Sequence, residues 1–495
     1  MSPTFRSLRV PNYRLWAVGA LVSNTGTWMQ RVAQDWLVLT ELTADSGVAV
    51  GITTGFQFGP VLLLAPMAGA VADRFDRRRV LMATQTASGV LALVLGLLVL
   101  TDTARLWHVY LLAGLLGCVA ALDGPARHAF VSELVGAEDL PNAVGLNSAS
   151  FHAGRLIGPG IAGMLIHWFG TGPVFLVNAV SFGAVWLALS RMRVSELREI
   201  RRSRGGRRAV RAGLSYVRHR PDIMIILLVV GMVGTFGLNF QLTTALMARL
   251  VFDKGPQEYG ILGSIMAIGS LTGALLAARR ERPDLRLVIG ATLVFGVVAG
   301  ATSLMPTYTL FAVALVPTGL SALTLMTAAN AAVLLSTPPE MRGRVSSLYM
   351  AIFMGGTPIG APVIGWIAEQ FGARWSILLG GIVSVATALV AAFWARRGKA
   401  RACAAVLPPR DEAAAAVVAS GGQVAVPAAA ATAGTAALAP PAEAEDALAE
   451  VFAAGHAAPA AGHGVAGDGN GAVRDGHGAV KEGCATVDPV PERSG

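Results

Sequence analysis

Charged residues are scarce in this chain. Of its 495 residues, 14% are Asp, Glu, Lys or Arg and 54% are hydrophobic, and the mean hydropathy is +0.58. Soluble domains carry about 25% charged residues. The shortage of charge excludes an ordinary soluble protein of this length, and the hydrophobic excess indicates a protein of the lipid bilayer.

Cysteine and the usual sets of catalytic residues are also scarce. The three cysteines, Cys118, Cys403 and Cys484, show no metal-ligand spacing and no obvious pairing. The sequence lacks a Gly-x4-Gly-Lys-Ser/Thr loop, which excludes an ATP-driven pump encoded wholly in this chain. The apolar stretches hold no histidine cluster, metal-ligand set or Ser-His-Asp set at a common depth, so we expect no enzyme activity, no cofactor and no metal.

Long apolar stretches dominate the chain as far as residue 394. About 20 apolar residues are needed to cross roughly 30 Å of hydrocarbon. Twelve stretches approach or exceed this length: 16–40, 47–72, 80–100, 107–122, 143–169, 173–192, 223–246, 259–278, 285–305, 308–329, 346–371 and 375–394. The residues before the first stretch lack the apolar core of a signal peptide, so we expect that stretch to be retained.

The surplus of positive charge indicates an orientation. The formal net charge is +9, and basic residues cluster before the first stretch and after the second, eighth and twelfth. Such clusters mark the cytoplasmic side of a membrane, so we expect both termini in the cytoplasm and no nucleic-acid partner. The basic segment between the sixth and seventh stretches fits a topology-setting linker, and it also fits a segment that binds anionic lipid.

The two ends of the apolar region repeat each other. Aligning Gly154 with Gly356 also superposes Gly158 on Gly360. This repeat predicts two six-helix halves. We place the N-terminal half at 1–192, a basic cytoplasmic linker at 193–220 and the C-terminal half at 221–398. Residues 399–495 are rich in Ala, Gly and Pro, which predicts a disordered cytoplasmic tail.

A short basic turn follows the second stretch. Its pattern, Gly-x3-Asp-Arg-x2-Arg-Arg, is formed by Gly69, Asp73, Arg74, Arg77 and Arg78. It resembles the loop between the second and third helices of major facilitator superfamily transporters, which usually reads Gly-x3-Asp-Arg-x-Gly-Arg-Arg. Asp76 stands here in place of that glycine. An ordinary cytoplasmic loop that obeys the positive-inside rule would carry the same arginines.

The resemblance implies an all-α membrane fold of twelve transmembrane helices in two pseudo-symmetric six-helix halves, with a substrate site between them. It also implies a cytoplasmic gate, in which Asp73 meets the start of the eleventh stretch near Arg342 and Arg344. Asp123 and Arg127, four residues apart, fit either a local helix pair or part of this gate. We expect a monomer in the cell membrane, in contact with lipid and a small-molecule substrate.

The fifth stretch carries a second family pattern. It is formed by Gly145, Gly154, Gly158, Pro159 and Gly163. The pattern resembles the fifth-helix motif of antiporters of the superfamily. Gly154 and Gly158 lie one turn apart and allow close approach of another helix, and Pro159 favours a kink. Generic packing of small residues is the alternative interpretation.

Two further segments narrow the resemblance. Residues 124–127, Gly-Pro-Ala-Arg, and residues 338–345 look like the branch that contains the enterobactin exporter and macrolide efflux proteins. This resemblance implies a secondary transporter that exports an amphipathic small molecule, such as a drug or siderophore, in exchange for protons. An uncoupled lipid or solute facilitator and a nontransporting membrane sensor or scaffold remain alternatives.

Ionisable residues within the stretches need a reason, because each costs about 2.5–3.5 kcal/mol at the centre of a membrane helix. In the first stretch, Arg31 and Asp35 share one helical face with Asn24 and Trp28. We predict that Asp35 carries the coupled proton and that Arg31 or Arg155 of the fifth stretch controls its charge. A static ion pair is the competing interpretation.

Other polar and aromatic residues are candidates for lining the substrate cavity. They are Asn24, Trp28, Gln34, Phe56, Phe58, Phe236, Asn239, Phe240, Gln241, Asn330, Tyr349 and Phe353. Packing and lipid contact are alternative roles for the aromatic members of this set.

Overall fold

The computed structural model of the chain describes residues 3–198, 214–277 and 283–406. These residues form helices and connecting loops, with no strand among them. The long helices are α1 (Pro11–Trp36), α2 (Gly47–Arg74), α3 (Arg77–Leu100), α4 (Leu106–Leu134), α5 (Leu140–Phe169), α6 (Gly172–Ser190), α10 (Pro256–Ala277), α11 (Leu285–Ser303), α12 (Tyr308–Leu335), α13 (Pro339–Phe371) and α14 (Ala373–Val406).

Shorter elements extend or interrupt the long helices. The π-helical segment η2 (Leu37–Leu42) continues α1. The seventh predicted stretch is a broken helix, made of α8 (Pro221–Met232), η4 (Val233–Gly237), α9 (Phe240–Leu246) and η5 (Met247–Val251). The short 3-10 helices η1 (Pro3–Arg9) and η3 (Val194–Glu196) flank the first six long helices.

Ten segments of the described residues are long and apolar enough to span a membrane. The remaining two long helices, α1 and α5, have 26 and 30 residues and carry Arg31, Asp35 and Arg155. Together these twelve segments correspond to the twelve predicted stretches. The predicted all-α membrane fold of twelve helices is therefore confirmed.

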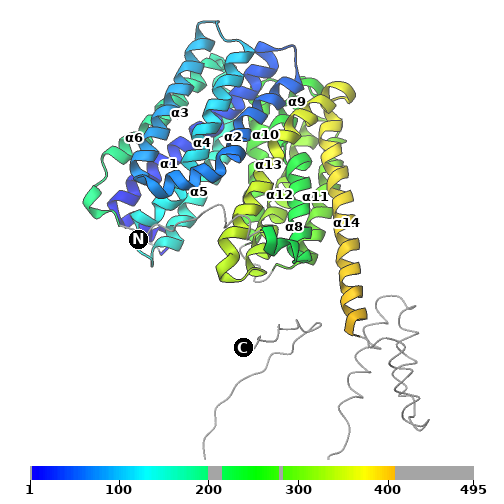
Figure 1. Cartoon of the computed structure of the whole chain (residues 1–495). Coiled ribbons are helices and arrows are strands. Elements are labelled where there is room, and N and C mark those ends of the chain that lie inside the picture. The colour runs from blue at the N-terminus through cyan, green and yellow to red at the C-terminus, as the bar shows by residue number, and fades with distance from the viewer. Residues whose placement is uncertain (1–2, 199–213, 278–282, 407–495) are drawn as a thin grey trace, which may run out of the picture. The chain divides into compact units, whose positions relative to one another are not determined.

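The helices pack in two sets (Figure 1). In the first set, α1 packs against α5 and α6, α2 against α4, and α3 against α4 and α6. In the second set, α10 packs against α12, and α11 against α12 and α14. Between the sets, α2 packs against α13 and α5 against α10. Two large helix pairs thus join the sets.

Glycines bring these pairs close at one end of the molecule. A Cβ atom on Gly51 of α2 would lie 2.4 Å from the carbonyl oxygen of Ala361 in α13. A Cβ atom on Gly260 of α10 would lie 2.2 Å from the carbonyl oxygen of Pro159 in α5. Side chains at the opposite end, such as Arg342 at the start of α13, are exposed. The sets are therefore joined near the α1–α2 loop.

Part of the predicted domain division lies outside the described residues. These parts are 199–213 of the predicted linker and 407–495 of the predicted tail. α14 continues to Val406, beyond the predicted end of the second half at residue 398. The boundaries of the halves, linker and tail stay predictions.

Candidate functional site

Asp35 lies where α1 meets the second set. Its side chain is buried, with 3% of the residue surface exposed. The Tyr259 hydroxyl of α10 lies 3.3 Å from Asp35 Oδ2 and 3.2 Å from the carbonyl oxygen of Gln241 in α9, and it can donate to either. A single buried proton therefore links α1, α9 and α10.

Aromatic and amide side chains enclose this carboxylate. Trp36, which follows Asp35, stacks on the ring of Tyr259 with centroids 5.9 Å apart and planes inclined by 22°. Gln34 is also buried, and its Nε2 has no hydrogen-bond partner among the described residues. The surroundings of Asp35 are thus protein side chains, without a compensating cation in direct contact.

The two arginines near this carboxylate bind an aromatic ring. The Arg31 guanidinium carbon lies 4.9 Å from the centroid of Trp28 and 5.3 Å from that of Phe58. The Arg155 guanidinium carbon lies 5.5 Å from the centroid of Trp28. Within the described residues, neither arginine has an ion pair with Asp35 at 4.0 Å or less. In this conformation the guanidinium groups of Arg31 and Arg155 both contact the ring of Trp28.

The glycines of the fifth-helix pattern explain this placement. A Cβ atom on Gly154 would lie 2.8 Å from the backbone of Asn24, and one on Gly158 would lie 2.7 Å from Trp28 Cβ. The two glycines therefore let α5 approach α1 closely. Arg155, next to Gly154 in the chain, is held beside Trp28 as a result. Gly163 makes the next close approach, to Pro256 at the start of α10.

Two predicted gate residues of α4, Asp123 and Arg127, belong to a hydrogen-bonded cluster. Arg127 Nε donates to Asp123 Oδ2 at 2.8 Å. The two residues lie one turn apart on α4 and form an ion pair. Thr84 and Gln85 of α3 both donate to Asp123 Oδ1 at 2.8 Å. The local helix pair is therefore present, and it is linked to α3. Whether it also acts as a gate stays a prediction.

The basic turn after α2 is held by contacts within the same set. Arg77 forms an ion pair with Glu133 of α4 at 2.6 Å, and Arg78 Nε donates to the carbonyl oxygen of Leu189 in α6 at 2.7 Å. Arg74 is exposed. Gly69 and Asp73 belong to α2. The Asp73 side chain lies outside the described part of the structure, so the predicted contact of Asp73 with α13 stays a prediction.

The gate residues predicted on α13 have local contacts. Arg342 Nε donates to the carbonyl oxygen of Thr337, and an Arg344 guanidinium nitrogen lies 3.3 Å from the sulfur of Met341. Both arginines are exposed. They are available to a partner at this end of the molecule.

The predicted cavity residues divide between the two sets. On the first set, Asn24 Nδ2 donates to Ser150 Oγ of α5 at 3.1 Å, close to Trp28. Phe56 of α2 is 46% exposed and packs on Tyr110 of α4.

On the second set, several of these side chains are packed inside. Phe240 is buried against Phe295, and Tyr349 stacks on Phe353. Asn239 is buried with its Oδ1 lacking a partner among the described residues. Phe236 is half-buried and Asn330 is exposed. A role in substrate contact stays a prediction for each of these residues.

Tyr259 is a site residue that the sequence analysis missed. It stands 224 positions from Asp35 and carries neither charge nor a family pattern. The ion pair of Arg249 with Asp45, at 3.0 Å across the two sets, was also missed, because the two residues lie 204 positions apart in the chain. No local signal in the sequence indicates either contact.

The chain is a membrane transporter of the major facilitator superfamily, which is a transporter family and not an enzyme family. Within it, the chain belongs to the transmembrane secretion effector family, whose pattern matches residues 2–428. Relatives named enterobactin exporter and macrolide efflux protein are among the matches, which confirms the predicted branch.

Two curated relatives and one solved structure illustrate the similarity. The staphyloferrin A transporter of Staphylococcus aureus is 27% identical over 51% of this chain, a match that spans 63% of that relative. The multidrug efflux pump Tap of Mycolicibacterium fortuitum is 26% identical over 76% of this chain and 94% of the pump. A bacterial homologue of the lysosomal transporter Spinster, in an inward-facing and occupied conformation, has the same fold with a TM-score of 0.61 and 16% identity, covering 80% of this chain and 98% of that one.

Proposed function

We propose that the chain is a proton-coupled exporter that moves an amphipathic small molecule, such as a drug or siderophore, out of the cell by alternating access. The names of the efflux and siderophore-transporting relatives support the direction and the substrate class. The observation that carries the coupling is Asp35, a buried carboxylate at the contact between the two sets.

The position of Asp35 supports a role in coupling. A charge buried without an ion pair is costly, so closure of the two sets around Asp35 favours its neutral, protonated form. Separation of α1 from α10 would admit water and remove the Tyr259 hydrogen bond. Asp35 would then take up a proton from the outside, and that proton would be released to the cytoplasm in the inward-open state, when the next substrate molecule binds. Proton transfer is thereby tied to the motion that moves the substrate.

The arginine pair around Trp28 supports the substrate class. Arg31 and Arg155 provide two positive charges, and Trp28 provides an aromatic face between them. An amphipathic molecule with an anionic group and an aromatic ring would bind such a surface through charge and stacking. We infer that this part of α1 and α5 contacts the substrate.

The direction of opening follows from the arginine-rich loops. We propose that both termini lie in the cytoplasm, so that the joined end of the two sets faces outside. The exposed start of α13 then faces the cytoplasm. This arrangement fits a protein, acting as a monomer, that takes its cargo from the cytoplasm or the inner leaflet.

Transport into everted membrane vesicles tests the proposal. A fluorescent amphipathic dye should accumulate against its gradient when the vesicle interior is acidified, and a protonophore should abolish the accumulation. Asp35→Asn should lose accumulation and keep equilibration of the dye. Equilibration by the unmodified protein, with no response to the pH gradient, would instead indicate an uncoupled facilitator, and the absence of both activities across a panel of dyes and siderophores would favour a sensor or scaffold.

A further inference from the structure

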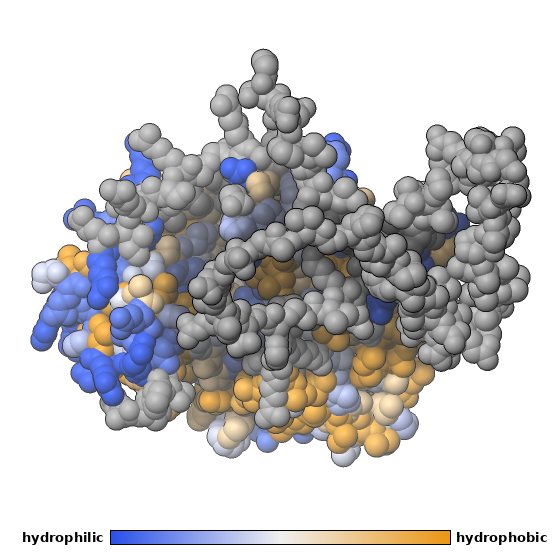
Figure 2. All heavy atoms as spheres, turned by 90° about the horizontal axis from the view of Figure 1, so that it is seen from below, coloured by the Kyte–Doolittle hydropathy of each residue, from blue (hydrophilic) through white to orange (hydrophobic). Residues whose placement is uncertain are grey.

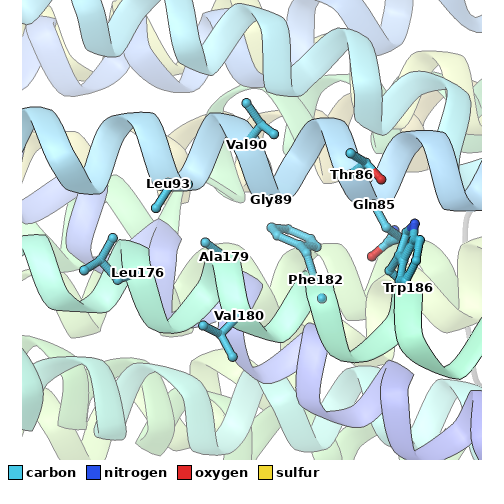
Figure 3. Close-up of a pocket in the computed structure, with 11 residues that line it drawn as sticks. Gln85, Thr86, Gly89, Val90, Leu93, Leu176, Ala179, Val180, Phe182 and Trp186 are labelled. Atoms are coloured by element: carbon cyan, nitrogen blue, oxygen red, sulfur yellow. The ribbon is translucent and has the colours of Figure 1, made fainter.

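A groove separates α3 from α6 on the outer side of the first set (Figure 3). Its volume is about 660 Å³. Gly89 of α3 and Gly183 of α6 line it and leave room between the helices. Its rim includes Val90 and Val180, which are 51% and 74% exposed. Because both helices are candidate membrane spans, this apolar rim meets the acyl chains of the bilayer.

One end of the groove contains a polar group without a partner. Gln85 lines the groove and is 2% exposed, and its Oε1 has no hydrogen-bond partner among the described residues. Its Nε2 already donates to Asp123. Figure 3 shows the Gln85 side chain reaching from α3 toward Trp186 of α6. A buried carbonyl oxygen without a donor is costly, so this end favours an occupant that supplies a donor.

Basic side chains lie at the same end of the two helices. The bond from Arg78 to the carbonyl oxygen of Leu189 joins the start of α3 to the end of α6. The neighbouring residues Arg79 and Arg191 are both exposed. Hydrophilic side chains gather on the first set at this end of the molecule (Figure 2). Basic sites between membrane helices on the cytoplasmic side attract anionic headgroups.

We propose that this groove binds an anionic phospholipid with a hydroxylated headgroup, of which phosphatidylglycerol is the simplest. Its phosphate lies at Arg79 and Arg191, a headgroup hydroxyl donates to Gln85 Oε1, and one acyl chain runs past Gly183. Gln85 lies six residues from Arg79, about 9 Å along α3, a distance that a headgroup and an arginine side chain cover together. The choice of the cytoplasmic leaflet rests on the proposed orientation.

The lipid would also act on the predicted gate. Gln85 bonds to the lipid through Oε1 and to Asp123 through Nε2, so an occupied groove holds the amide in one orientation. In that orientation Gln85 Nε2 keeps its hydrogen bond to Asp123, which forms an ion pair with Arg127. Lipid binding therefore stabilises the contact between α3 and α4 without touching the site around Asp35.

Photo-crosslinking in nanodiscs tests this site. The full chain is placed in discs that contain trace phosphatidylglycerol or phosphatidylcholine with a diazirine in the acyl chain, and labelled peptides are mapped by mass spectrometry. We expect phosphatidylglycerol to label residues 85–93 and 176–186 at least five-fold more than phosphatidylcholine does. Equal labelling by both lipids would overturn the proposal.

Matched glycine variants separate the groove from general lipid contact. A Cβ atom on Gly183 or on Gly290 of α11 would meet no atom within 4 Å, and both glycines are exposed on membrane helices. Gly183→Leu fills the groove and should reduce the labelling at least five-fold, whereas Gly290→Leu should leave it unchanged. Undiminished labelling in Gly183→Leu would contradict the proposal.

Arginine variants test recognition of the headgroup. Arg79→Gln combined with Arg191→Gln should reduce the preference for phosphatidylglycerol by more than ten-fold, because each basic residue near an anionic surface contributes roughly five-fold in affinity. Acyl-chain labelling by phosphatidylcholine should persist. A preference that survives in this double variant would show that the arginines do not hold the phosphate. None of these outcomes depends on transport, so failure of the proposed export function would leave the test intact.

Discussion

The Arg249 guanidinium and the Asp45 carboxylate form an ion pair across the two sets of helices, with Nε 3.0 Å from Oδ1. Arg249 belongs to η5, and Asp45 lies between η2 and α2. Nearby, Glu369 of α13 accepts hydrogen bonds from the backbone nitrogen of Val48, at 3.0 Å, and from the Ser46 hydroxyl. In the proposed cycle these contacts break each time the exporter opens outward.

Removing this ion pair should favour the outward-open state. Both side chains are partly exposed, so the pair contributes about 0.2–1 kcal/mol. Arg249→Gln should therefore raise the ratio of outward-open to inward-open molecules by a factor of about 1.4 to 5. Spin labels at the exposed residues Asp102 and Pro306, one on each set, would report this ratio as a distance distribution. Lys254→Gln, which removes an exposed charge from the loop that follows η5, should leave the ratio unchanged, and an equal shift in both variants would rule out the specific pair.

A methyl group at Gly360 should prevent stable folding. Its Cβ atom would lie 1.7 Å from the carbonyl oxygen of Thr235, a backbone atom of the same set. Overpacking of this kind costs about 1–3 kcal/mol or more, so Gly360→Ala should lower the midpoint of thermal unfolding by many degrees or abolish expression. Gly290→Ala is the matched control, because its added methyl meets no atom within 4 Å. Equal thermal stability of the two variants would contradict the observed packing.

A methyl group at Gly51 should act on conformation instead. Its Cβ atom would lie 2.4 Å from the carbonyl oxygen of Ala361, but this clash is between the two sets. The sets can separate to relieve it, so Gly51→Ala should remain folded and populate the outward-open state. The same pair of spin labels measures the shift. A loss of folded protein comparable to that of Gly360→Ala would show that the two sets cannot move independently at this contact.

Hydropathy and spacing predicted most of the architecture. Apolar length predicted the long helices, and the close glycines of α5 predicted that another helix approaches it closely. The structure identifies that helix as α1. The break in the seventh stretch was not predicted. Leu238 and Asn239 leave the helical conformation there, although neither is glycine or proline. Gly237, a poor helix former, directly precedes the break, but the apolar run continues through it, so hydropathy carries no signal for it.

Of the site around Asp35, the sequence predicted only the arrangement of residues within a single helix. Spacing along α1 indicated that Trp28, Arg31 and Asp35 share a face. The partners of that face come from α5 and α10, whose rotation and register against α1 are set by packing across the whole chain. Tyr259 therefore could not be assigned to Asp35 from sequence, and the expected pairing of Asp35 with an arginine is replaced in this conformation by cation–π contacts with Trp28.

The proposed orientation is tested by single cysteines in a chain without native cysteine. A cysteine in place of Ser203, in the basic linker, should react with a membrane-impermeant maleimide only from the cytoplasm. A cysteine in place of Ala44, between η2 and α2, should react only from outside. The arginine clusters set this expectation, because positive loops are retained on the cytoplasmic side. Reversed labelling would invert the direction of every transport step proposed above.

The link between Asp35 and Tyr259 provides the sharpest test of coupling. Asp35→Asn keeps the size of the side chain but cannot exchange a proton, so uphill export should fall at least ten-fold while downhill movement of substrate continues. Tyr259→Phe removes the hydroxyl that lies 3.3 Å from the carboxylate, and it should alter the pH profile of uphill export. A hydrogen bond between neutral groups contributes about 0.5–1.5 kcal/mol, so the change should be measurable.

A double-mutant cycle decides whether the tyrosine acts through the carboxylate. If it does, Tyr259→Phe should have no further effect on the pH profile once Asp35 is asparagine. Tyr308→Phe is the matched control, because the Tyr308 hydroxyl donates to the carbonyl oxygen of Glu258 and, within the described residues, makes no hydrogen bond to Asp35. Its effect on rate should be the same in both backgrounds. Additive effects of Tyr259→Phe and Asp35→Asn would show that the two residues work independently, and unchanged coupling in a well-expressed Asp35→Asn protein would remove Asp35 as the proton carrier.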